Sequence, residues 1–64
     1  MENKYLYYLG KLRDVFIWSD YEELFIARAD RVLIAAQLDP DLSLTLHSEL
    51  CDQFVKLSNE YKRF

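Results

Sequence analysis

The near absence of glycine and proline is the feature that most restricts the folds open to this chain. Gly10 and Pro40 are the only residues of their kinds among 64 positions. Turns depend on these two residue types for their special backbone angles, so a loop-rich fold is disfavoured. With 52% hydrophobic and 16% aromatic residues, the composition also argues against disorder. The sequence therefore predicts an all-α fold, a single helical domain over residues 1–64.

The small size of this domain limits its stability. A chain of about 60 residues buries only about 60% of the surface that its unfolded form exposes. Because Cys51 is the only cysteine and His47 the only histidine, neither an internal disulfide nor a structural zinc site can form. We therefore expect no metal and no cofactor. A second subunit is the remaining source of stability, so we expect a homodimer.

The charge balance favours protein partners. Eleven acidic residues stand against eight basic ones, for a net charge of -3, which disfavours direct binding to nucleic acid or to an anionic membrane. No run approaches the roughly 20 apolar residues of a membrane span. The opening "MENK" is not followed by the apolar run of a signal peptide. We expect a soluble, cytoplasmic protein.

The first half of the chain contains two predicted helices. Ser19 and Glu22 have the spacing of a capping box, which predicts that the second helix begins at Ser19 with Trp18 just outside it. Gly10 in the first helix indicates either a tolerated glycine or a close helix crossing. Arg28 and Arg31 flank the apolar face of the second helix, where a solvated role is favoured over a binding one. The first helix is recognised by apolar residues at steps of four, three and four: Tyr5, Leu9, Leu12 and Phe16.

The stretch "LDPDLSLTLH" admits two interpretations. Alternating leucines over residues 42–46 are typical of a half-buried strand. A lone strand would leave its backbone groups unpaired, so we favour a helix with Asp39 as N-cap and Pro40 at its first position. Running to about Lys62, this helix would be about 34 Å long and would extend beyond the other two. The sequence thus predicts an antiparallel three-helix bundle with a long C-terminal helix.

The C-terminal end of this helix is the predicted interaction surface. Apolar residues recur there with the spacing of a heptad seam. If the shorter helices leave this end uncovered, its side chains expose an apolar strip that a second copy or a target protein must cover. The predicted protein interface consists of Phe54, Leu57, Tyr61 and Phe64.

The chain offers little for catalysis. His47 and Cys51 stand four residues apart, with Asp52 adjacent, so a metal or a nucleophile can be imagined. Between Val32 and Val55, however, the sequence has acidic residues and no lysine or arginine to activate a thiol. We expect no catalytic residues, a packed Cys51 and a surface His47.

Two segments resemble known families over part of the chain. The S-x-x-x-D spacing of Ser48 and Asp52 in "SELCD" looks like the motif of the small sporulation aspartyl-phosphate phosphatases. "YLGKLR" followed by "SDYEELFIARAD" is similar to segments of the Hha family, small modulators that bind the nucleoid protein H-NS. Neither is taken as identifying the chain.

The function expected from these features is that of a small non-enzymatic regulator or adaptor. It would dock an aromatic and aliphatic helix face into the groove of another protein. The alternative is an acidic inhibitor of the phage-antagonist type, which occupies the site of a nucleic-acid-binding protein. Its contact would be rich in carboxylates and sensitive to salt.

Overall fold

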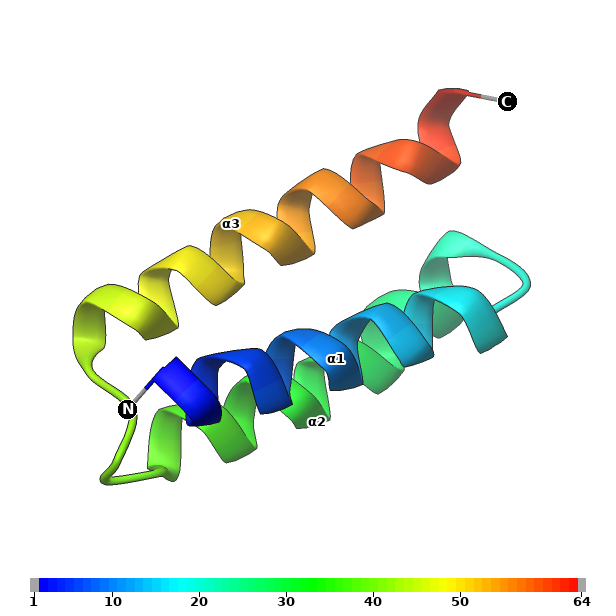
Figure 1. Ribbon diagram of the computed structural model, residues 1–64. Helices are drawn as coiled ribbons and strands as arrows, with labels where there is room; N and C mark the ends of the chain where they lie inside the picture. Colours follow the sequence, from blue (N-terminus) through cyan, green and yellow to red (C-terminus); the bar gives the residue numbers. More distant parts are fainter. Residues whose placement is uncertain (1, 64) are drawn as a thin grey trace.

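The computed structural model describes residues 2–63 and consists of three helices packed against one another. Helices α1 (Glu2–Trp18), α2 (Glu22–Leu38) and α3 (Leu44–Glu60) have 17 residues each. A single 3-10 turn, η1 (Tyr61–Arg63), follows α3. No strand occurs among the described residues. The prediction of an all-α bundle is confirmed, and Figure 1 shows α3 packing against the α1–α2 pair.

Hydrogen bonds between side chains tie the helices at both ends of the bundle. The Tyr8 hydroxyl of α1 donates to Asp39 Oδ2, at the end of α2, over 2.7 Å. At the opposite end, the Ser58 hydroxyl of α3 donates to Glu22 Oε2, at the start of α2, over 2.8 Å. The two connections, residues 19–21 and 39–43, consequently lie at opposite ends of the molecule (Figure 1).

The predicted capping box at the start of α2 is wrong. The N-cap residue is Tyr21, and its side chain makes no capping hydrogen bond. Ser19 is 7% exposed, and its hydroxyl donates to the Val15 carbonyl over 2.6 Å. The last carbonyls of a helix have no partner within it, and Ser19 satisfies one of these in α1. Trp18 is the last residue of α1, ahead of the connection.

The predicted start of the third helix is also wrong. The N-cap is Ser43, whose hydroxyl accepts a hydrogen bond from the Leu46 amide over 3.2 Å. Asp39 instead ends α2 and accepts from the Asp41 amide over 2.9 Å, which forms a local turn. Because α3 begins at Leu44, it is as long as α1 and α2, and the expected long C-terminal helix is absent. The strand alternative is wrong as well, since Leu42 lies buried in the connection.

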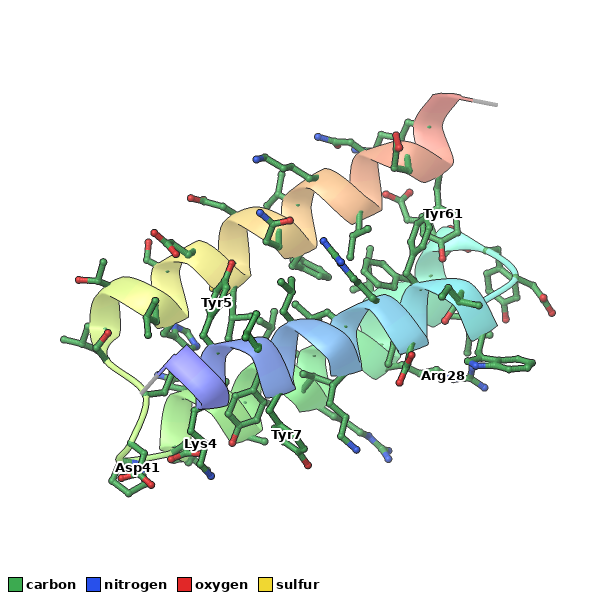
Figure 2. All side chains as sticks on the ribbon, viewed as in Figure 1. Lys4, Tyr5, Tyr7, Arg28, Asp41 and Tyr61 are labelled. Carbon is green, nitrogen blue, oxygen red and sulfur yellow. The ribbon has the colours of Figure 1, made fainter. Side chains whose placement is uncertain are left out.

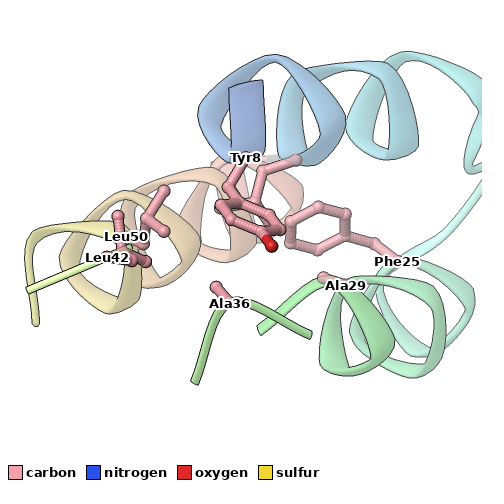
Figure 3. Packing of buried hydrophobic residues seen from close by; sticks show 7 residues of the cluster. Tyr8, Phe25, Ala29, Ala36, Leu42 and Leu50 are labelled. Atoms are coloured by element: carbon pink, nitrogen blue, oxygen red, sulfur yellow. The ribbon is translucent and has the colours of Figure 1, made fainter. Parts of the chain in front are cut away.

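The core lies between the three helices and draws on each of them. Leu12 of α1, Phe25 of α2 and Leu50 of α3 are its largest fully buried side chains. Burying such a side chain contributes about 1.5–3 kcal/mol. Ala29 and Ala36 occupy buried positions of α2, where only a small side chain separates its backbone from the neighbouring helices (Figure 3). One core thus serves the described part of the chain.

Two further features bear on the sequence predictions. A Cβ atom added at Gly10 would have nothing within 4 Å, so Gly10 is a tolerated glycine and marks no close helix crossing. In the described part of the chain, every helix falls short of the length and apolar character that crossing a membrane requires.

Candidate functional site

The C-terminal end of α3 packs against the other two helices. Phe54 stacks on Phe25 with their ring centroids 5.5 Å apart, and Tyr61 meets Phe16 edge-on at 5.2 Å. Leu57 is also half-buried against the core. In Figure 2 the Tyr61 side chain points from η1, directly after α3, toward the α1–α2 turn. The expectation that these three residues stand uncovered is wrong, because α3 does not extend a long way beyond the other helices.

The interface predicted at Phe54, Leu57, Tyr61 and Phe64 was argued from an uncovered helix end. That reason no longer holds. Phe64, the fourth residue assigned to it, lies outside the described residues. A hollow of about 380 Å³ lies on the last turns of α3, lined by Lys56, Leu57, Asn59 and Glu60. All four described lining residues belong to one helix, so this hollow offers only one wall. A role for the strip in self-association or target binding stays a prediction.

The Tyr61 hydroxyl also has a structural role. It lies 3.2 Å from the Phe16 carbonyl and 3.3 Å from the Ser19 carbonyl, and it donates to this pair at the end of α1. Burial, helped by the nearby Asp20 carboxylate, raises the pKa of Tyr61 above its ordinary value. These partners are 45 and 42 positions away in the sequence, so no local motif could have indicated them.

The other end of the bundle is held by a polar cluster. Asp39 accepts from the Tyr8 hydroxyl and the Asp41 amide, and Lys4 Nζ lies 3.1 Å from Asp39 Oδ2. These hydrogen bonds, that of Tyr8 foremost, lower the pKa of Asp39 to about 2. The bond to Asp39 likewise raises the pKa of Tyr8 and of Lys4. With its partners all within the chain, this cluster serves as a structural tie between α1 and α2.

His47 and Cys51 do lie together on α3. Cys51 Sγ is 3.9 Å from His47 Nδ1, and His47 Nε2 is 3.4 Å from the Leu33 carbonyl of α2. If Nε2 carries the hydrogen and donates to Leu33, Nδ1 can accept from the thiol. Both residues are half-buried, so His47 is less exposed than expected. Among the described residues, no group of three or more His, Cys, Asp or Glu side chains could hold a metal ion.

An open groove lies between α1 and α2 on the side away from α3. It measures about 400 Å³ and is lined by Val15 of α1 together with Leu24, Ala27, Arg28 and Arg31 of α2. We call it the α1–α2 groove. Leu24, Arg28 and Arg31 recur at helical spacing, which aligns them along α2. Figure 2 shows Arg28 on the side of the helix pair opposite α3.

A row of exposed residues runs along α1 from Trp18, at the groove, toward the start of the helix. Tyr7, Lys11, Asp14 and Trp18 follow steps of four, three and four and are all exposed. The Trp18 side chain is 75% exposed and that of Tyr7 54%. We call the groove and this row together the α1–α2 face.

Two contacts organise the charges of the α1–α2 face. Arg28 Nη1 donates to the Trp18 carbonyl over 3.1 Å, which ties the arginine to the end of α1. Lys11 Nζ lies 5.4 Å from the centroid of the Tyr7 ring, a cation–π contact. Within the described residues, no carboxylate forms an ion pair with Arg28 or Arg31. The sequence predicts only a solvated role for these arginines, because spacing along one helix cannot reveal a groove that forms with another helix.

No family model, no curated protein and no solved structure matches this chain. The two local resemblances noted in the sequence therefore gain no support, and the candidate surface rests on the residues of this chain.

Proposed function

We propose that this domain is a small non-enzymatic regulator or adaptor that binds another protein through its α1–α2 face. The observation that carries the proposal is the exposure of Trp18 beside an open groove, with Tyr7 exposed in the same helical row. Tryptophan, tyrosine and arginine are the residue types that most often dominate binding energy at protein interfaces. All three occur on this face.

The rings of the α1–α2 face are less packed than those of the core, although Tyr7 meets the Tyr8 ring edge-on with centroids 5.1 Å apart. Tyr61 and Phe54 pack on Phe25, whereas the Trp18 ring is mostly in water. Single exposed apolar residues are normal on a protein surface. Trp18 lies next to the hollow, because Arg28 of its lining bonds to the Trp18 carbonyl. Tyr7 stands in the same helical row, with Lys11 and Asp14 between the two rings. An exposed tryptophan beside a hollow lined by apolar atoms and arginines is typical of an interaction surface.

The arrangement and association of the helices form the second part of the proposal. The Tyr8–Asp39 and Ser58–Glu22 bonds support an antiparallel course for neighbouring helices. A homodimer stays a prediction, which sedimentation at about 100 µM can test. With much of the α3 strip packed in the core, the α1–α2 face is the better candidate for any contact surface.

The alternative function, an acidic inhibitor of a nucleic-acid-binding protein, stays a prediction. Its contact surface would need to be rich in carboxylates. The α1–α2 face has three cations and one carboxylate, so it does not suit that role. The two functions can be separated by the sign of the charges on which binding depends.

Comparative capture from the source cell tests the proposal. The bait proteins are the wild type, a face variant with Tyr7→Ser and Trp18→Ser, and a control variant with Leu44→Ser and Val55→Ser. The control removes two exposed apolar side chains from α3. We expect one partner protein to be retained by the wild type and the control and lost by the face variant. Capture that the face variant retains in full would contradict the proposal.

A further inference from the structure

We infer that the α1–α2 groove binds an acidic, amphipathic helical segment of a partner protein, with one apolar side chain between the two helices and carboxylates on Arg28 and Arg31. This inference rests on the proposed function and names the chemistry of its partner. The groove is too open to enclose a small molecule, and both its walls are helices. An amphipathic helix laid between two helices is a recurrent mode of recognition.

The floor of the groove suits one apolar side chain. Val15 and Leu24 are half-buried, and Ala27 is exposed and carries only a methyl group. This combination leaves apolar atoms on both sides of a space that no side chain among the described residues fills. A leucine or phenylalanine from a partner would cover these atoms and exclude water from them, which stabilises the complex.

The arginines of α2 select the charge of the partner. Arg28 is held at the end of α1 by its bond to the Trp18 carbonyl, which uses one of its five N–H donors. Among the described residues no side chain forms an ion pair or hydrogen bond with the Arg31 guanidinium, which lines the same groove. Guanidinium groups bind carboxylates through paired hydrogen bonds, and charge-assisted bonds of this kind are the strong ones.

Charge complementarity favours an acidic segment over a basic one. The described residues that line the groove include two cations, Arg28 and Arg31, and no carboxylate, on a chain whose total charge is -3. At physiological salt the screening length is about 8 Å, so the local cations govern a contact more than the distant acids do. The acidic total disfavours the phosphate backbone of a nucleic acid, which spreads its charge over a longer surface.

The test selects peptides on the wild-type chain from a phage-displayed library of random peptides. We expect enriched sequences to combine aspartate or glutamate with leucine or an aromatic residue at helical spacing. The affinity of a synthetic enriched peptide should fall at least about tenfold in the Arg31→Glu variant, since reversing one charge removes an attraction and adds a repulsion. Arg31 is the residue to change first, because its guanidinium group makes no hydrogen bond or ion pair with the described residues.

A matched control keeps the result specific. Lys56→Glu makes the same kind of charge reversal on α3, and the affinity should change by less than about threefold there. Arg28→Glu should weaken the peptide as Arg31→Glu does, provided that circular dichroism shows an intact fold. Fluorescence titration with a single-stranded oligothymidine provides the nucleic-acid arm, and we expect no binding that depends on Arg31.

Four results would overturn the inference: enrichment of basic peptides, enrichment of acidic peptides that bind the Arg31→Glu variant equally well, Arg31-dependent binding of the oligothymidine, and no enrichment at all. If capture from the source cell still depends on Tyr7 and Trp18, the proposed function survives and only the acidic segment is refuted. If neither the peptide selection nor the capture gives the expected result, the proposed function is refuted as well.

Discussion

The two groups of aromatic side chains in this molecule differ in what surrounds them. Phe16, Phe25, Phe54 and Tyr61 form contacts edge-on, stacked or tilted at the end of the bundle where α3 finishes. Tyr7 and Trp18, on the outer side of α1, have exposed rings.

Aromatic spacing along a helix therefore does not distinguish a core from an interface. Phe54 and Tyr61 are seven residues apart, and both pack inward. Tyr7 and Trp18 are eleven residues apart, also in one helical row, and both face water. Only the placement of the neighbouring helices decides which row is covered.

The largest expected effect comes from placing glutamates in each row. Phe54→Glu with Tyr61→Glu should unfold the chain, because burying two carboxylates against Phe25 costs several kcal/mol, a large part of the total stability of a small domain. Tyr7→Glu with Trp18→Glu should lower the free energy of unfolding by about 1 kcal/mol at most, since those positions are exposed. Circular dichroism with thermal unfolding measures both. A folded, monomeric Phe54/Tyr61 variant would show that α3 is not packed as described.

A smaller effect is expected from removing a hydroxyl in each group. Tyr61→Phe deletes the donor to the Phe16 and Ser19 carbonyls and should lower the free energy of unfolding by about 1–2 kcal/mol. Tyr7→Phe is the matched control and should change it by less than about 0.5 kcal/mol, because the Tyr7 side chain is exposed. Urea titration gives both values. Equal losses in the two variants would mean that the Tyr61 bonds add nothing.

The outer side of α1 also allows a stabilising change. Gly10→Ala should raise the free energy of unfolding by about 0.5–1 kcal/mol, since alanine restricts the unfolded chain and the added methyl group meets no atom within 4 Å. Urea titration measures the gain. A loss of stability would contradict this packing, because it would mean that another atom lies close to Gly10.

The smallest effect is expected at the polar end, where it depends on pH. Hydrogen bonds from Tyr8 and Asp41 lower the pKa of Asp39 to about 2, below its unfolded value near 4. The stabilisation by Asp39 is therefore complete above about pH 4 and disappears as the pH falls toward 2. The melting temperature of Asp39→Asn should fall less than that of the wild type across this window. Parallel curves for the two proteins would show that Asp39 does not contribute.

The existence of three helices could be predicted because it depends on local spacing. Leu12 belongs to the apolar row that predicts the first helix, and it is fully buried. Such rows follow from the helical repeat alone, which is a property of the sequence.

The helix ends could not be predicted, because distant residues compete for the capping groups. Ser19 has the spacing of a capping box with Glu22, yet its hydroxyl bonds to Val15, and Glu22 accepts from Ser58, 36 positions away. Asp39 meets Tyr8 across 31 positions. The groove was missed for the same reason, since Val15 and Arg31 come together only when α1 packs on α2.

The fluorescence of Trp18 tests the central claim most directly, because it is the only tryptophan and its exposure defines the candidate surface. We predict that the isolated chain at low concentration emits like hydrated indole and is readily quenched by acrylamide. An acidic peptide selected on the wild type should shift this emission to the blue and protect it from the quencher. Blue-shifted, protected emission from the isolated chain at low concentration would contradict the account, because the ring would then be buried without a partner.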